Sequence, residues 1–388
     1  MVARFRCTEF LHTDQAEPAS SFDSPLLLPT IITPSRIKEH LDKYVVGQEH
    51  AKRTLSVALY NRTLRIMDSC LNTSEVAMEK SNIMMIGPTG SGKTFLIHKI
   101  SELLNTALII ADATSFTETG YIGRDLREIF VGLVNKAYIV ALKTGTVTGA
   151  AELTTKTKEI AEHGIVYIDE IDKIASGPNS NRRFEDSLQQ ELLKMVEGDT
   201  VVFDDLLSNN KARLDNPTGI TSLDTKNILF IIGGSFPGLE KHIGDRINPS
   251  SVGFKGDINT KETIDSRRVL KEVRPEDLIK YGFSDEFVGR FFIRTVLDRL
   301  TKRDLVNILT KPKNSFIKQY KKLFGLSNRE LIFTKQALNK VAELAIKNTT
   351  GARALRNILE KTLENHQFDA PDQPFGPAIR ITSRLVRE

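Results

Sequence analysis

Residues 87–94 match a phosphate-binding loop, in which four residues separate a glycine from the sequence Gly-Lys-Thr. Glycines let the backbone fold tightly enough to turn its amide groups toward phosphate oxygens. In such a loop Lys93 reaches the β- and γ-phosphates, and the hydroxyl of Thr94 can ligate Mg²⁺. The pattern predicts a site for ATP and Mg²⁺, and a purely structural glycine turn is the alternative. The other residues predicted to bind the nucleotide here are Pro88, Thr89, Gly90, Ser91, Gly92 and Phe95.

A second chemical signal is an apolar run, residues 165–168, that ends in Asp169 and Glu170. The run predicts a buried strand, and Asp169 at its end can hold Mg²⁺ through water. Glu170 can polarise a water molecule for attack on the γ-phosphate. Alone, such an acidic pair more often marks the start of a helix. With the phosphate loop upstream, it predicts ATP hydrolysis with Lys93 and Glu170 as catalytic residues.

Short apolar strands that alternate with helices position these residues. Strands are expected at 82–86, 107–111, 165–168, 227–232 and 291–296, with a helix from the loop to residue 104. Continuously apolar strands alternating with helices are typical of a parallel sheet covered on both faces. The predicted fold class is therefore α/β, with a P-loop nucleotide-binding domain.

The chain outside this domain differs in pattern. Residues 1–32 show no sustained periodicity and predict a flexible tail. Beyond residue 300 the pattern is mostly helical, with helices expected at 304–310, 314–324, 334–346 and 352–365 and a strand at 378–382. We therefore predict a tail (1–32), a large nucleotide-binding domain (33–300) and a small, mainly helical domain (301–388).

Composition excludes several classes of protein. Of the 388 residues 40% are hydrophobic and 27% charged, which are ordinary globular proportions and argue against disorder or a collagen-like chain. There are 2 cysteines, Cys7 and Cys70, so a cysteine zinc site is not expected. Without an apolar run of ~18 residues no membrane span is expected. We expect a cytoplasmic protein, with an organelle matrix as the alternative.

The charge is uneven. The whole chain carries +5, but residues 301–388 contain 17 Lys or Arg and 8 Asp or Glu. This basic region is either an anion-binding face or a set of solvated helices, and composition favours the second.

Eight stretches resemble the ClpX/HslU branch of the AAA+ unfoldases, and the resemblance runs in order over residues 33–365. The interval between Gly123 and Ile165 is too short for the inserted domain of the related HslU proteins. The resemblance implies an AAA+ P-loop domain followed by a small helical lid domain. The stretches are 33–52, 82–94, 111–114, 119–123, 164–174, 192–198, 287–290 and 350–353, and residues 233–239 are also similar to ClpX.

The resemblance assigns roles around the nucleotide. Val45 and Val46 would pack against the adenine. Arg290 corresponds to the arginine finger that enters the neighbouring subunit's site, which implies a ring of the chain with itself, six subunits in this family. Arg353 corresponds to the second sensor, which contacts phosphates in its own chain. Ser235 is a weak candidate for the first sensor.

Two loops would act on other proteins. Tyr121 and Ile122 correspond to the pore loop that grips unfolded or tagged protein substrates, although such residues are more often a packing plug. Val252, Gly253 and Phe254 correspond to the tripeptide that docks on the ClpP peptidase, with a loop folded back on its own domain as the alternative.

The sequence also departs from this family. The amino-terminal zinc-binding domain and the basic pore-entrance loop are not recognisable, so substrate choice should differ. The predicted function is an ATP-dependent unfoldase and translocase that feeds ClpP. A stand-alone remodelling chaperone is the alternative. A nucleic-acid-acting ATPase is a third, weaker hypothesis, because no aromatic residues interleave with the basic ones; nucleic acid and membrane are not expected partners.

Overall fold

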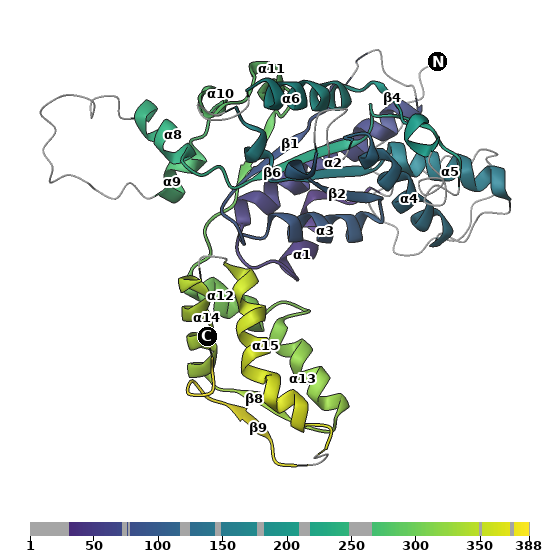
Figure 1. The fold of residues 1–388 in the computed structure, drawn as a ribbon. Helices are drawn as coiled ribbons and strands as arrows, with labels where there is room; N and C mark the ends of the chain where they lie inside the picture. The colour runs from purple at the N-terminus through teal and green to yellow at the C-terminus, as the bar shows by residue number, and fades with distance from the viewer. Residues whose placement is uncertain are drawn as a thin grey trace, which may run out of the picture.

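The computed structural model places the chain in two bodies, drawn one above the other in Figure 1. The upper body holds a five-stranded sheet with helices on both faces, and the lower body is a small helical unit. They meet near α1 (Pro34–Asp42) and α12 (Lys302–Thr310). The structure describes residues 31–71, 76, 78–116, 125–143, 149–176, 182–208, 218–247, 266–348, 351–372 and 376–387.

All neighbouring strands of the large sheet are parallel, in the order β2-β3-β6-β1-β7. The predicted α/β class and parallel sheet are therefore confirmed. Each predicted strand is present, with its ends shifted by one or two residues. The strands are β1 (Ile83–Ile86), β2 (Leu108–Asp112), β3 (Ile165–Asp169), β6 (Leu229–Gly234) and β7 (Ile293–Val296).

Alternate residues of the central strands enter two separate cores. Ile83, Met85 and Tyr167 pack with α1, α2 (Glu49–Leu71) and α3 (Lys93–Leu104) on one face. Met84 and Ile86 face the other core. Since neighbouring strand residues point to opposite faces, a fully buried sheet needs the unbroken apolar runs seen in the sequence. The helices over the second face are α4 (Glu128–Lys143), α5 (Ala150–Glu162), α6 (Arg182–Glu197), α8 (Leu239–Ile247), α9 (Ser266–Lys271), α10 (Pro275–Tyr281) and α11 (Asp285–Gly289).

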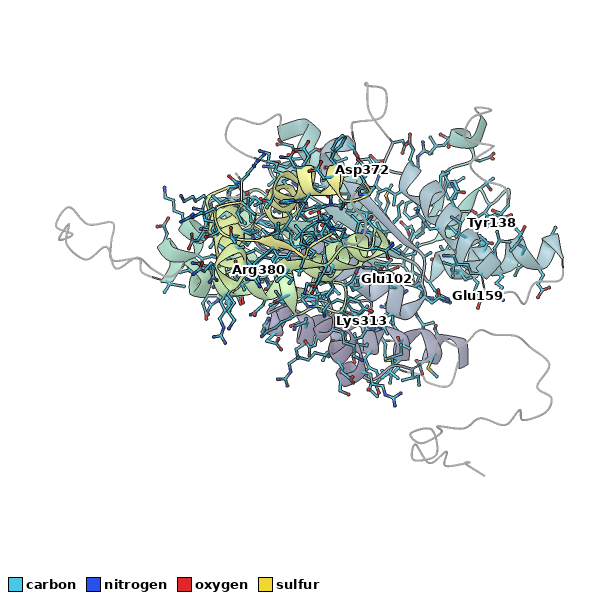
Figure 2. All side chains as sticks on the ribbon, turned by 90° about the horizontal axis from the view of Figure 1, so that it is seen from below. Glu102, Tyr138, Glu159, Lys313, Asp372 and Arg380 are labelled. Carbon is cyan, nitrogen blue, oxygen red and sulfur yellow. The ribbon has the colours of Figure 1, made fainter. Side chains whose placement is uncertain are left out.

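Several elements of this body were not predicted from the sequence. In the sequence, the helices α4 and α5 come between β2 and β3. The antiparallel pair β4 (Thr200–Val202) and β5 (Ser222–Asp224) comes between β3 and β6. Seen from below, the α4–α5 pair, with Tyr138 and Glu159, extends to one side of the lower body (Figure 2). Short 3₁₀ turns are η1 (Ala113–Ser115), η2 (Ile171–Ile174) and η3 (Asp205–Ser208).

The lower body has its own apolar core, built from four helices and a small sheet. The Thr301 hydroxyl accepts from the Asp304 amide and the Asp304 carboxylate accepts from the Thr301 amide, a reciprocal cap that fixes where α12 begins. The predicted small, mainly helical unit is confirmed, while the domain limits at 32 and 300 stay a prediction. Besides α12 it contains α13 (Phe316–Leu326), α14 (Lys335–Lys347), α15 (Ala352–Asp369), and the parallel strands β8 (Leu331–Phe333) and β9 (Ile379–Ile381).

In the part of the chain that the structure covers, no helix combines the length and apolarity needed to cross a membrane.

Candidate active site

The phosphate-binding loop connects β1 to α3, as predicted. Gly90 and Gly92 have φ angles of 76° and 102°, in the left-handed region that glycine adopts without steric cost. Gly92 also caps α3, whose first amide groups have no acceptor within the helix. Free amides and the positive end of a helix dipole together favour an anion at this position.

Lys93 lies inside the loop, and its side chain is mostly buried. Its Nζ donates to the carbonyl oxygens of Gly87 at 2.6 Å and Pro88 at 3.4 Å. Burial lowers the pKa of Lys93, while Asp169 and Asp172 oppose that effect and Arg353 adds to it. A phosphate bound here would supply the negative charge that stabilises the ammonium form.

Asp169 is the last residue of β3 and faces the loop. The Thr94 hydroxyl donates to Asp169 Oδ2 at 2.8 Å, so the two predicted magnesium-associated side chains lie together. The other oxygen, Oδ1, accepts from the backbone amide of Glu170 at 3.0 Å. Glu170 itself has a φ of 56°, an uncommon value that ends the strand abruptly and leaves its exposed carboxylate on the pocket wall.

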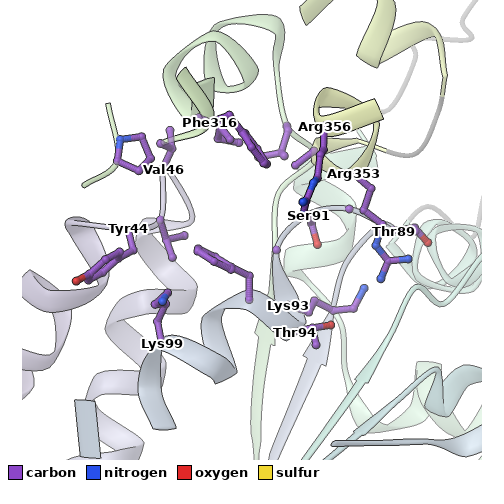
Figure 3. Close-up of a pocket in the computed structure, with 18 of the residues that line it drawn as sticks. Tyr44, Val46, Thr89, Ser91, Lys93, Thr94, Lys99, Phe316, Arg353 and Arg356 are labelled. Carbon is purple, nitrogen blue, oxygen red and sulfur yellow. The ribbon is translucent and has the colours of Figure 1, made fainter. Parts of the chain in front are cut away.

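These residues line a cavity of about 760 Å³ between the two bodies (Figure 3). That volume is in the range of small-molecule sites. The end away from Asp169 is more apolar and is lined by Val45 and Val46, whose contact with an adenine stays a prediction. The Lys99 ammonium lies 4.9 Å from the ring centre of Tyr44 and 5.5 Å from that of Phe95. The lower body contributes Ile308, Pro312 and Phe316 to this end.

The start of α15 covers the phosphate loop from the lower body. Arg353 lines the cavity, and its guanidinium points toward the Lys93 ammonium (Figure 3). Gly351 has a φ of 60°, and a Cβ atom there would lie 3.1 Å from the Gly90 carbonyl oxygen. The Ala352 amide donates to that same oxygen at 3.4 Å. Two cations from two bodies therefore converge where phosphates would lie.

Ser235, at the end of β6, also lines the cavity. Its amide donates to Asp172 Oδ1 at 3.0 Å and its hydroxyl lies 3.1 Å from Oδ2. Asp172 is buried, so these bonds compensate part of the cost of removing its charge from water. Ser235 is thus fixed near the acidic pair, and its role as a first sensor stays a prediction.

Arg290 does not line this cavity. It follows α11, and its Nη2 lies 2.5 Å from Glu197 Oε1 at the end of α6. The two side chains are 49% and 36% exposed, so the pair is accessible to solvent and to another chain. The Asn82 side chain donates to the Arg290 carbonyl oxygen at 3.2 Å and holds the backbone beside β1.

Most predicted nucleotide residues meet in one place. The structure brings Val45, Val46, residues 89–95, Asp169, Glu170 and Arg353 to one cavity, and Pro88 contributes only its carbonyl oxygen beside it. Tyr121 and Ile122, and the residues Val252, Gly253 and Phe254, lie outside the described residues.

Several cavity residues were missed in the sequence. Arg356 lies one helical turn after Arg353, a spacing that could have identified it. Phe316, Pro312 and Ile308 left no local signal, because only the approach of the two bodies brings them to the cavity. Within the described ranges, no three or more His, Cys, Asp or Glu side chains are grouped so that they could hold a metal ion.

Comparison with protein-family models gives two matches. The AAA domain (Cdc48 subfamily) matches residues 78–294, and the C-terminal, D2-small domain of ClpB protein matches residues 300–371. The first match contains β1, the phosphate loop and the acidic pair. The second contains α12–α15 and Arg353.

Two curated relatives of the chain, from Borrelia duttonii and Treponema denticola, are described as "ATP-dependent Clp protease ATP-binding subunit ClpX", and a third, from Methylococcus capsulatus, as "ATP-dependent Clp protease ATP-binding subunit ClpX 3". The protein from Borrelia duttonii is 41% identical over an alignment of 389 positions, which covers 98% of this chain and 85% of the relative. The protein from Treponema denticola is 40% identical, covering 92% and 81%. The "ClpX 3" protein from Methylococcus capsulatus is 40% identical, covering 88% and 77%.

Proposed function

The chain belongs to the ClpX family of AAA ATPases, and on that premise we propose that it is an ATP-driven protein unfoldase that delivers polypeptides to a Clp peptidase. The observation that carries the proposal is the cavity between the two bodies, where Lys93, Arg353 and the Thr94–Asp169 pair converge. The chain is an ATPase whose site is built from both bodies. Binding and hydrolysis of ATP would therefore change the position of one body relative to the other.

ATP would lie with its base at the apolar end, against Val45 and Val46, and its phosphates on the loop amides. Lys93 and Arg353 would neutralise the β- and γ-phosphates. Charge on the γ-phosphate would thereby hold α15 of the lower body against the loop, where Gly351 already approaches Gly90.

A magnesium ion fits the donor set. The Thr94 hydroxyl and the Asp169 carboxylate are oxygen ligands of the type Mg²⁺ prefers, and they lie within 2.8 Å of each other. When bound with ATP, the ion would neutralise charge on the β- and γ-phosphate oxygens.

Glu170 would act as the general base. Its carboxylate would take a proton from a water molecule as the water oxygen attacks the γ-phosphorus, and the bond to the β–γ bridging oxygen breaks to leave ADP. Two observations support this assignment. The Glu170 side chain is exposed in the cavity, and the Glu170 backbone amide donates a hydrogen bond to the Asp169 carboxylate.

Arg290 would complete a neighbour's site, because it does not line the cavity of its own chain. Its contact with Glu197 is solvent-exposed, and such pairs contribute only about 0–1 kcal/mol, so Arg290 could leave it readily. This supports a ring of identical subunits, and the family suggests six.

Tyr121 and Ile122 would grip unfolded or tagged substrates in the ring's pore, and Val252, Gly253 and Phe254 would dock on the peptidase. The alternative is a stand-alone remodelling chaperone of the same family. The three-part division at residues 32 and 300 and a cytoplasmic location also remain proposals.

Degradation of a stably folded, tagged protein that carries a fluorescent label tests the proposal, because such a substrate must be unfolded before it is cleaved. We expect degradation only when the chain, ATP and the Clp peptidase of the same source are all present. Phe254→Ala should abolish degradation and peptidase binding but keep ATP turnover. If the chain hydrolyses ATP and remodels proteins but never binds the peptidase, the stand-alone chaperone is correct. Absence of substrate processing in every combination contradicts both.

A further inference from the structure

Gln48 is a buried glutamine at the junction of three segments, and it has no role in the ATP hydrolysis described above. It lies between α1 and α2 and is 6% exposed. Gly47 and Gln48 have φ angles of 67° and 58°, so two successive residues adopt the left-handed conformation. For a residue with a side chain this is uncommon and needs surrounding contacts to hold it.

Those contacts come from both ends of the Gln48 amide group. Its Oε1 accepts from the Asp298 backbone amide at 2.8 Å, and its Nε2 donates to the Asp298 carbonyl oxygen at 2.9 Å. The same Nε2 lies 3.3 Å from the carbonyl oxygen of Ser91 in the phosphate loop. One side chain therefore bonds to two segments that lie far apart in the sequence.

Asp298 belongs to the connection between the two bodies, between the end of β7 and the start of α12. The residue before it, Leu297, donates its amide to Ile86 at the end of β1 at 2.7 Å. On the other side of the turn, the Lys313 amide of the lower body donates to the Lys43 carbonyl oxygen at 2.8 Å. The turn that holds Gln48 thus contacts both the connection and the lower body.

We propose that Gln48 is a positioning residue that couples the phosphate loop to the connection between the two bodies. Because one rigid amide group bonds to both, neither the Ser91 carbonyl nor the Asp298 backbone can move far alone without losing a hydrogen bond. The arrangement transmits a nucleotide-dependent change in the loop to the angle of the lower body. This inference rests on the proposed ATP-driven function and adds a route between site and movement.

A buried glutamine could instead serve only stability, and the chain contains a matched control for that case. Gln189 is 1% exposed, and its Nε2 donates to Ile174 and Gly282 carbonyl oxygens at 2.9 and 3.3 Å. Its Oε1 accepts from the Ser284 amide at 2.9 Å. This glutamine makes the same number of bonds of similar length but contacts neither the phosphate loop nor the connection.

The test measures movement between the bodies directly. Cys7 and Cys70 are replaced by serine, and dyes for resonance energy transfer are attached to cysteines introduced at Thr155 in α5 and Lys322 in α13. Glu170→Gln is included to prevent turnover. We expect ATP to change the transfer efficiency, Gln48→Glu to abolish most of that change, and Gln189→Glu to leave it intact. ATP affinity, measured on the same samples, should stay within about threefold in all of them.

Several results would overturn the coupling role. They are an unchanged response in Gln48→Glu, an equal loss in Gln189→Glu, or loss of ATP binding itself in Gln48→Glu, which would make Gln48 part of site formation. If Gln48→Glu does not fold, Gln48→Asn keeps the amide but is too short for both segments, and the same expectations apply. Phosphate release by the chain with native Gln48 and Glu170 separates the coupling role from the ATP-driven function. If this chain releases no phosphate, the ATP-driven function is refuted. If it does, the results above test the coupling role alone.

Discussion

Thr94 and Asp169 are joined by a hydrogen bond of 2.8 Å, although Thr94 lies in the first turn of α3 and Asp169 ends β3. This bond brings the phosphate loop and the acidic pair into one site. The contact needs the parallel sheet, which puts the carboxyl ends of its strands at one edge.

Asp169→Asn should therefore weaken the magnesium dependence of nucleotide binding. Loss of the carboxylate removes a charge that favours Mg²⁺, so we expect ATP turnover to fall by about 100-fold or more. Titration of ATP binding and turnover against magnesium measures both effects. Asp112→Asn is the control, because Asp112 ends the neighbouring strand in register with Asp169 but does not line the cavity. Equal behaviour of the two variants would contradict the assignment.

Mixing two inactive chains tests whether Arg290 acts on a neighbour. Arg290→Ala should reduce turnover by roughly 10³-fold while ATP still binds. When this variant is mixed with Glu170→Gln, some sites combine an intact Glu170 with an Arg290 from the adjacent chain, and phosphate release should partly return. If the mixture stays as inactive as its components while both assemble, Arg290 does not act between chains.

Lys80 should give the fold a specific pH dependence. Its Nζ donates to the Thr225 carbonyl oxygen and lies 4.6 Å from the ring centre of Phe230, and burial, with Arg65 and Arg62 nearby, lowers its pKa to about 7. Between this pKa and the ordinary lysine value of 10.5, the unfolded chain binds a proton that the folded chain does not. The contribution of Lys80 to the free energy of unfolding therefore rises with pH across that interval.

Urea unfolding of the native chain and Lys80→Met at several pH values measures this contribution. The difference between the two urea midpoints, Lys80→Met minus native chain, should be largest at pH 6 and should decrease toward pH 9. A difference that does not vary with pH would show that Lys80 is protonated throughout.

Gly233 in β6 should not tolerate a side chain. A Cβ atom there would lie 2.2 Å from the Tyr167 hydroxyl oxygen, so Gly233→Ala should destabilise the fold by about 1–3 kcal/mol. Tyr167→Phe in the same chain should recover part of that loss, because it removes the closest atom. Gly244→Ala is the control, since a Cβ there would have no atom within 4 Å apart from the neighbouring backbone of its own helix, and a helical alanine is favoured by ~1 kcal/mol. Thermal unfolding measures the stability of the native chain and the three variants. Equal unfolding temperatures of Gly233→Ala and Gly244→Ala would contradict this prediction.

The sequence was sufficient for the elements whose signals are local. The glycine loop, the apolar run before Asp169 and the periodic helices of the lower body each carry their own pattern, and the structure contains them. The short strand β8 was missed, and its only strand partner in the described part of the chain is β9, which is distant in the sequence. Gln48, Phe316 and the Glu197 contact of Arg290 depend on distant segments meeting, which no local spacing encodes.

The most direct test of the catalytic assignment is Glu170→Gln, measured for ATP binding and for phosphate release on the same sample. We expect binding within about threefold of the native chain and phosphate release lower by about 100-fold or more, because the amide cannot accept the water's proton. Glu240→Gln in α8, away from the cavity, should release phosphate at the native rate. A Glu170→Gln chain that also hydrolyses ATP at the native rate would show that this carboxylate is not the base and would contradict the site proposed for the motor.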